Sequence, residues 1–190
     1  MKGNAIVLIL PASVMIGLFI FGYLSLSQEE VVSNEELQHS LTINNELIDE
    51  RTLHIEWKWG DFPEDGIRGN DFIEILLPDD VVDELNDHDV GVHISLSQGD
   101  QMIYESNRSQ ISANGLIIAF PNEVQDEQIL GPSGEFTATF DELNINDFRE
   151  EIEIRYFHTW FDHQIELKPR VDIDQRLIDE GIQSYWIVAS

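Results

Sequence analysis

The chain has 190 residues, which leaves room for one ordinary domain and a short additional segment. Its 37 acidic and 10 basic residues give a formal net charge of −27 at pH 7. Such a chain repels phosphate backbones, so nucleic acid is excluded as an expected partner and a cationic protein or peptide is favoured. The absence of Cys excludes disulfides, thiolate metal sites and a cysteine nucleophile.

An uncharged apolar run covers residues 5–26 and predicts a transmembrane helix. At about 1.5 Å per residue it spans roughly 33 Å, enough for a hydrocarbon core of about 30 Å. Lys2 precedes the run, whereas Glu29 and Glu30 follow it. Because positive flanks stay inside, we expect residues 1–4 to be cytoplasmic and the rest to lie outside a cell membrane that the chain crosses once.

A cleaved signal peptide is the alternative interpretation of the same run. Ser25 and Ser27 are small residues placed correctly for cleavage before Gln28, which would make the protein secreted. The apolar run is longer than the usual signal core of about 7–15 residues, which favours an uncleaved anchor. Both interpretations place the domain outside the cytoplasm, and an exported chain without Cys favours a bacterial source.

Residues 27–50 are polar and show only a weak helical pattern, with Ser33 as a cap ahead of Glu36. We therefore expect a polar, partly helical spacer here. The acidic extracytoplasmic domain is expected to cover residues 51–190.

From residue 52 onward, apolar residues recur at every second position, which is typical of half-buried β-strands. The clearest case is residues 52–59, where Leu53, Ile55, Trp57 and Trp59 share one face. Further strands are predicted at 72–77, 90–97, 101–105, 115–120, 135–140, 151–156, 164–168 and 185–189, with short helical segments at 79–85, capped by Asp79, and 141–148. The fold class is mainly β: an antiparallel β-sandwich, immunoglobulin-like in pattern, preceded by one transmembrane helix.

Three acidic clusters are candidates for a hard cation. The first combines Asp61, Glu64 and Asp65 with Asp71, but its spacing fails the EF-hand pattern. The others cover residues 86–89 and 172–174. Solvated acidic turns explain all three more simply, so no cofactor is expected and calcium stays an open alternative.

The segment 156–163 is aromatic and is predicted to form the tip of a hairpin. Exposed aromatic residues at such a tip anchor partner proteins. The candidate partner-binding residues are Phe157, His158, Trp160, Phe161 and His163. The alternative is that these rings fold back onto the core. His158 and His163 would also need a third ligand to form a zinc site, and the sequence identifies none.

The sequence contains no HExxH, GxSxG or phosphate-loop motif, so no catalytic residues are predicted. The leading hypothesis is a membrane-tethered extracytoplasmic binding or interaction module without catalytic activity. The alternative is a cation-responsive ectodomain, with calcium as the cation. The third hypothesis is a secreted hydrolase whose catalytic acid and base are among the many carboxylates and cannot be singled out from the sequence.

Overall fold

The computed structural model describes residues 4–26, 32–86, 89–162 and 165–190, and the side chains of the first range only over 11–23. The chain divides into two compact units, residues 1–31 and residues 32–190. Each unit is described separately.

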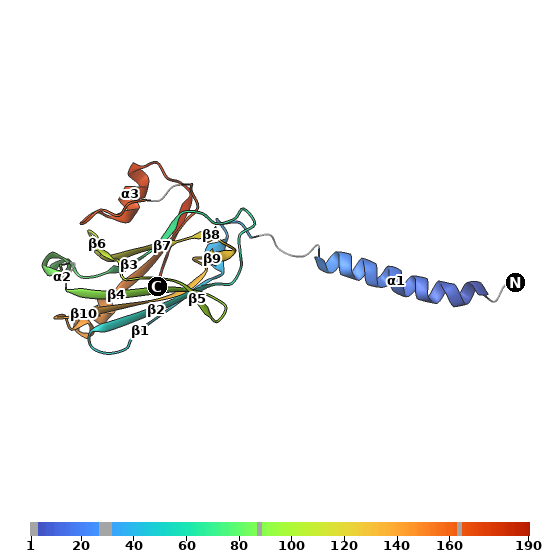
Figure 1. The fold of residues 1–190 in the computed structure, drawn as a ribbon, viewed down its shortest axis with the longest axis horizontal. Helices are drawn as coiled ribbons and strands as arrows, with labels where there is room; N and C mark the ends of the chain where they lie inside the picture. The colour runs from blue at the N-terminus through green and yellow to red at the C-terminus, as the bar shows by residue number, and fades with distance from the viewer. Residues whose placement is uncertain (1–3, 27–31, 87–88, 163–164) are drawn as a thin grey trace. The chain divides into compact units, whose positions relative to one another are not determined.

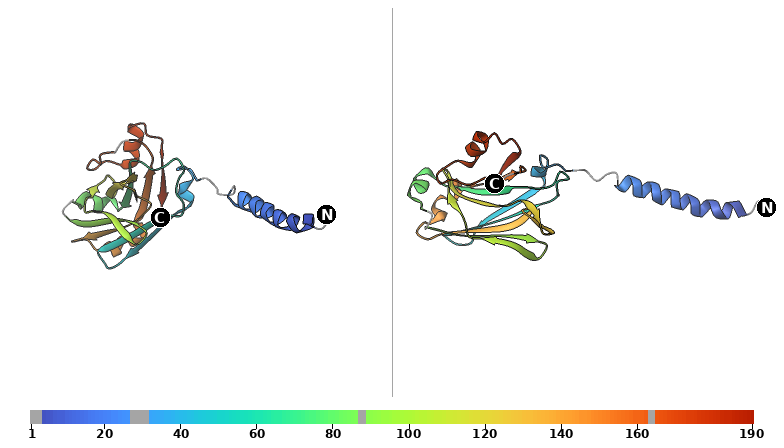
Figure 2. Two further views of the ribbon diagram at one scale, coloured as in Figure 1. Left: turned by 45° about the vertical axis from the view of Figure 1, so that its right-hand side comes forward. Right: turned by 45° about the horizontal axis from the view of Figure 1, so that its top comes forward.

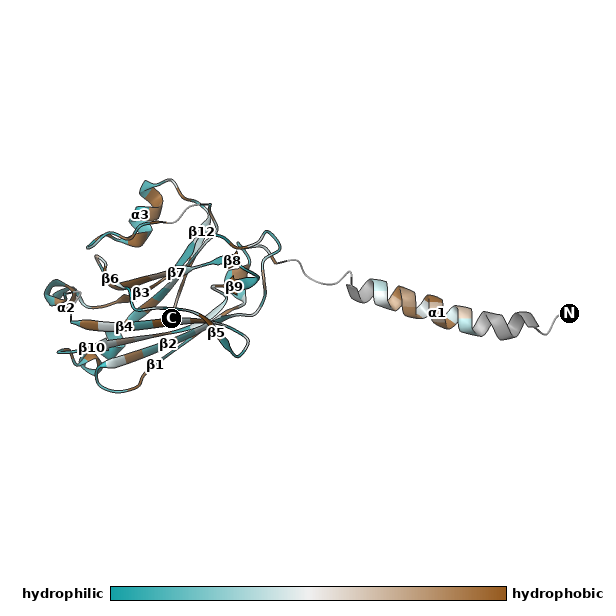
Figure 3. Cartoon of the chain, in the orientation of Figure 1, coloured by the Kyte–Doolittle hydropathy of each residue, from teal (hydrophilic) through white to brown (hydrophobic). Residues whose placement is uncertain are grey.

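The first unit contains helix α1 (Asn4–Leu26), which includes Pro11. Its described large apolar side chains are exposed. Figure 3 colours most of the described part of α1 brown, which marks hydrophobic residues. The described side chains cover 13 residues of α1. In the part of the chain that the structure describes, no helix is both long enough and apolar enough to cross a membrane.

The second unit is an antiparallel β-sandwich of two five-stranded sheets, as the sequence predicts (Figure 1). Sheet A has the order β1 (Leu41–Leu47), β2 (Thr52–Trp59), β10 (Ser133–Phe140), β4 (Val90–Gln98), β5 (Gln101–Ser106). Sheet B has the order β12 (Tyr185–Ala189), β11 (Glu153–Thr159), β3 (Asn70–Leu76), β7 (Gly115–Pro121), β6 (Gln110–Ile111).

Shorter elements complete the second unit. A two-stranded ribbon is formed by β8 (Glu123–Gln125) and β9 (Gln128–Leu130). The described helices of this unit are η1 (Leu37–His39), α2 (Asp79–Glu84), η2 (Ile145–Glu151) and α3 (Ile173–Asp179). The helical segment predicted at 79–85 is found as α2, although Pro78 rather than Asp79 occupies its N-cap position. The segment predicted at 141–148 is helical only from residue 145, where η2 begins.

The main core lies between the sheets and follows the predicted alternation. The apolar residues of β2 that were expected to share a face are at most 5% exposed. They belong to one apolar cluster with the inward residues of sheet B, among them Ile73, Ile75, Leu116, Ile118 and Phe120. Burying each such side chain contributes about 1.5–3 kcal/mol, so the alternation of β2 is itself a large stabilising term.

A second apolar cluster covers the outer face of sheet B. Phe72, Ile117 and Phe157 point outward from β3, β7 and β11, and they pack against Ile165, Ile173, Leu177 and Ile182. Figures 1 and 2 show α3 over this side of the sandwich. Sheet B is therefore buried on both faces, which explains why β7 reads as a continuous apolar run instead of an alternating one.

The expected spacer at residues 27–50 needs correction over the part that the structure describes, residues 32–50. Leu37 is fully buried, and β1 pairs with β2 over seven positions, from Leu41↔Trp59 to Leu47↔Leu53. The inward residues Leu41, Ile43 and Leu47 do alternate, but Asn45 interrupts the pattern. The sandwich unit therefore begins at residue 32 rather than 51.

The predicted strand at 164–168 is also wrong, since residues 165–168 form no strand. Instead, β11 continues to Thr159 and pairs with β12, with Thr159 opposite Tyr185. Ile165 is buried in the second apolar cluster. Consequently β11 is not followed by the predicted hairpin.

Candidate functional site

The predicted aromatic tip does not form an exposed surface. Phe157 and His158 lie inside β11 and are 0% exposed, so neither is available to a partner. Trp160 and Phe161 are half-buried against the main core and the second cluster respectively. His163 lies outside the described residues. The described rings have folded back onto the core, which was the alternative interpretation.

His158 instead belongs to a buried polar cluster centred on Asp71, and both side chains are 0% exposed. The Asp71 carboxylate accepts hydrogen bonds from the Tyr156 hydroxyl at 2.7 Å, the Thr159 backbone N–H at 3.0 Å and Asn122 Nδ2 at 3.0 Å. His158 Nδ1 lies 3.1 Å from Asp71 Oδ2. Three donors and one imidazole nitrogen therefore converge on this one carboxylate.

The hydrogen bonds also define the surroundings of both ring nitrogens of His158. Its Nε2 lies 2.8 Å from Asn34 Oδ1, whose identity as oxygen follows because Asn34 Nδ2 donates to the Gly66 carbonyl. Nε2 thus faces Asn34 Oδ1, and Nδ1 faces the Asp71 carboxylate, with Asn122 Nδ2 3.4 Å from the same nitrogen. When the imidazole is protonated, His158 and Asp71 form a buried ion pair.

Three tryptophans surround the His158 ring. The ring centroids of Trp59, Trp160 and Trp186 lie 4.9, 5.4 and 4.8 Å from that of His158. Trp160 stacks on the imidazole and Trp59 meets it edge to face, so aromatic rings pack on several sides of His158. Trp186 Nε1 also donates to the Asn34 carbonyl oxygen at 2.7 Å.

The Asp71 cluster is sealed from solvent and acts as a structural clamp. Burial raises the pKa of Tyr156 well above its usual value, and the neighbouring Asp71 charge and hydrogen bond raise it further. Buried titratable clusters occur at active sites as well as in structural networks. Here, Asp71, His158, Asn122 and Asn34 are at most 1% exposed, so no substrate reaches them.

Among the described residues, the acidic clusters that left calcium open as an alternative do not form a group of converging ligands. Asp71 is committed to the interior, and Asp65 Oδ1 accepts from the Asn34 backbone N–H at 3.1 Å. Asp172 caps α3, and Asp174 accepts from the Tyr185 hydroxyl at 2.7 Å. In the cluster at residues 86–89, Asn86 Nδ2 donates to Asp89, and residues 87–88 lie outside the described residues.

These local hydrogen bonds are reflected in two pKa shifts. Partial burial raises the pKa of Asp172, but hydrogen bonds from Asn114 and the Gln175 backbone N–H outweigh burial and leave its pKa lowered. Burial, together with the hydrogen bond to Asp174, raises the pKa of Tyr185 to about 12. Both shifts have structural causes within the domain.

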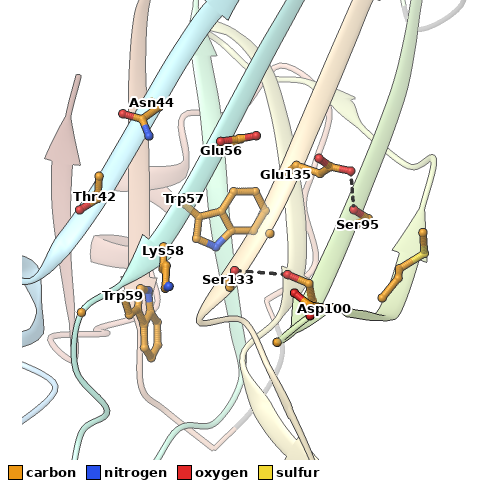
Figure 4. Close-up of a pocket in the computed structure, with 15 residues that line it drawn as sticks. Thr42, Asn44, Glu56, Trp57, Lys58, Trp59, Ser95, Asp100, Ser133 and Glu135 are labelled. Atoms are coloured by element: carbon orange, nitrogen blue, oxygen red, sulfur yellow. Dashed lines mark hydrogen bonds between the residues drawn. The ribbon is translucent and has the colours of Figure 1, made fainter.

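The outer face of sheet A is the open polar surface of the domain. It carries a groove of about 570 Å³, shown in Figure 4, that crosses the strands from β1 to β5. The outward side chains of the groove are mostly acids, hydroxyls and amides. They are Thr42, Asn44, Glu56, Lys58, Ser95, Ser97, Asp100, Met102, Ser133 and Glu135.

The strand register places two carboxylates face to face in this groove. Glu56 of β2 lies directly opposite Glu135 of β10, and Glu135 lies opposite Ser95 of β4. Ser95 Oγ donates to Glu135 Oε1 at 3.1 Å, which orients that carboxylate. Like charges directly opposite on neighbouring strands are destabilising, so this arrangement favours an added cation.

His54 lies beside the two carboxylates. Its Nε2 is 3.3 Å from Glu56 Oε1, and its Nδ1 is 3.2 Å from Thr137 Oγ1. The ligand atoms of His54, Glu56 and Glu135 all lie within 4.8 Å of one another. The three side chains together therefore present one nitrogen and two carboxylates to the solvent.

Neither Glu56 nor Glu135 was singled out from the sequence. The missing information was strand order, because β2 and β10 are far apart in the sequence. Comparisons of the chain with protein-family models, curated proteins and solved structures found no match.

Proposed function

We propose that this protein is a non-enzymatic binding module, held at the outer face of a cell membrane, that binds its partner on the outer face of sheet A. The observation that carries this proposal is the open polar groove there, on a sandwich whose sheet B is buried on both faces. The groove carboxylates are accessible to water, since the Glu56 side chain is 58% exposed. Catalytic acids and bases usually act where water is excluded, so this exposure favours binding over catalysis.

The apolar character of α1 supports a tether. Met15, Phe19, Phe21 and Tyr23 are each at least 67% exposed, although they point to different sides of the helix. A helix that is apolar all round is stable in an apolar environment rather than in water. The charges that flank residues 5–26 favour a cytoplasmic N-terminus and an extracytoplasmic domain, and cleavage before Gln28 would give a secreted domain instead.

The tether predicts that the full chain, expressed in a bacterium, stays with membranes after an alkaline wash and retains its N-terminal segment by mass spectrometry. Leu18→Asp should release much of the protein, because a carboxylate at the centre of a span costs about 2.5–3.5 kcal/mol. Leu18→Ile is the matched control and should stay with the membrane. A mature chain that starts at Gln28 would contradict the tether and leave a secreted domain.

A cation-responsive ectodomain is the second candidate function. It is favoured by the grouping of His54 with Glu56 and Glu135, whose ligand atoms lie within 4.8 Å of one another. A set that includes an imidazole suits zinc or nickel, whereas calcium prefers oxygen ligands alone. This observation therefore favours a transition metal over the calcium that the sequence suggested.

Thermal unfolding of the full chain in a non-ionic detergent tests the proposed function. The ligands are a basic peptide, a neutral oligosaccharide, zinc and calcium, with chromogenic ester and glycoside substrates assayed in parallel. We expect a saturable rise in Tm with one ligand class and no turnover, since a ligand at about 100 times its Kd stabilises by about 2.7 kcal/mol. Turnover with a defined pH optimum would contradict the binding module.

The same experiment separates the second candidate from simple screening of charge. A saturable rise in Tm with zinc that disappears in His54→Ala would favour the cation-responsive ectodomain. An equal response to every salt at matched ionic strength would indicate only that salt screens the repulsion among the many carboxylates.

A further inference from the structure

We infer that the groove on the outer face of sheet A binds a basic segment of a partner protein and holds one guanidinium or ammonium group between Glu56 and Glu135. This inference deepens the proposed function and rests on it. It names the chemistry of the partner and the residues that recognise it.

The strand register creates the recognition element. Glu56 and Glu135 face each other across β2 and β10, and neighbouring strands lie about 4.8 Å apart. A guanidinium group presents five N–H donors in a planar fork, so it can donate to two carboxylates at this spacing. Placing a cation there relieves the repulsion between the two carboxylates, and His54 then borders the bound group.

One carboxylate of the pair is already oriented. Ser95 is 5% exposed, and its hydroxyl donates to Glu135 at 3.1 Å. Figure 4 shows this hydrogen bond and shows Glu56 and Glu135 on adjacent strands. An oriented acceptor loses less freedom when it binds a cation, so Glu135 should contribute more to affinity than an unrestrained surface glutamate.

The rest of the groove suits an extended chain that carries basic residues. Thr42, Asn44 and Ser133 offer hydroxyl and amide groups to the backbone of a bound segment. Asp100 lies at the far end of the groove, where the chain turns from β4 to β5, and can meet a second basic residue. Lys58 also lines the groove, so it should repel a cation placed beside it and restrict where basic residues sit.

The overall charge does not by itself select this surface. A net charge of −27 attracts any polycation and speeds its approach, whichever face it meets. A test of the groove must therefore compare variants that lose the same charge at different places. Glu150 and Glu153 are exposed, lie near the end of η2 and at the start of β11, and do not line the groove.

The probe is fluorescein-labelled hexa-arginine, and its fluorescence anisotropy is followed with the full chain in a non-ionic detergent at about 150 mM salt. We expect the double variant Glu56→Gln with Glu135→Gln to weaken binding at least about tenfold. The matched variant Glu150→Gln with Glu153→Gln should change Kd by less than about twofold. Lys58→Gln should tighten binding, because it removes a repulsive charge from the groove.

Three outcomes would overturn the inference. Equal weakening by the two double variants would mean that only the overall charge attracts the peptide. Saturable zinc binding that needs Glu56 and Glu135, with hexa-arginine binding unaffected by their substitution, would assign the pair to a metal. A rise in Tm with a neutral oligosaccharide and no binding of hexa-arginine would reject the basic partner while the proposed binding function survives.

Discussion

Asp71→Asn is expected to destabilise the sandwich by about 3–5 kcal/mol, although it removes no volume from the core. The substitution leaves the buried His158, whose Nδ1 lies 3.1 Å from Asp71 Oδ2, without its carboxylate partner. It also places an amide NH₂ among groups that all donate, including the Tyr156 hydroxyl and the Thr159 N–H. Each donor that loses its acceptor in the interior adds about 1–3 kcal/mol.

Chemical denaturation followed by tryptophan fluorescence measures this effect, because all four tryptophans lie in the sandwich unit and three of them surround His158. Asp83→Asn is the control, since Asp83 is exposed on α2 and its loss should change stability by less than about 0.5 kcal/mol. A double-mutant cycle with His158→Gln isolates the interaction between the two side chains. Strictly additive effects of the two substitutions would show that Asp71 and His158 do not interact.

The Asp71 cluster also explains how the first residues of the sandwich unit are held in place. Asn34 uses its backbone N–H, its carbonyl and both side-chain polar atoms to contact Asp65, Trp186, Gly66 and His158. These four hydrogen bonds reach three separate parts of the domain and hold Asn34 in place. The residue is only 1% exposed. Loss of the Asp71 charge should therefore loosen the segment around Asn34 as well as the core.

Most strands could be predicted because their period of two is local information. The bounds of β2 and β12 match the prediction residue for residue. The strand β1 was missed because Asn45 interrupts its inward apolar pattern, and only the pairing with β2 reveals it. The end of β11 was missed because Phe157, His158 and Thr159 are buried on both faces, which removes the alternation.

The candidate site could not be predicted, because it depends on which strands are neighbours. Glu56 and Glu135 are far apart in the sequence, and only the position of β10 between β2 and β4 brings them together. The buried carboxylate–imidazole pair is similar, since Asp71 and His158 come from β3 and β11. Their residue types suggested solvent-exposed loops, and only the tertiary contacts reveal that both are buried.

Gly134→Ala is expected to destabilise the protein by about 3 kcal/mol or more, because two rigid neighbours leave no room for a methyl group. A Cβ atom at Gly134 would lie 2.5 Å from the Trp57 ring and 2.6 Å from the Ser95 carbonyl oxygen. The ring cannot swing away easily, since Trp57 Nε1 donates to the Gly131 carbonyl at 2.9 Å and the side chain is 2% exposed. The Ser95 oxygen belongs to the neighbouring strand β4, so relieving the contact must displace β10 from β4.

Gly91→Ala is the matched control, because Gly91 lies on β4 in the same sheet and a Cβ atom there would be 3.9 Å from its nearest neighbour, the Thr139 carbonyl oxygen. This control should be neutral or stabilising by up to about 1 kcal/mol, since alanine restricts the unfolded chain. Equal stability of the two variants by denaturation would contradict the close packing at Gly134.

Displacing β10 would also move Glu135 away from Ser95 and Glu56, so Gly134→Ala should weaken hexa-arginine binding even where the chain remains folded. The core contact of Gly134 and the surface carboxylate pair would then depend on one feature, the position of β10 between its two neighbours.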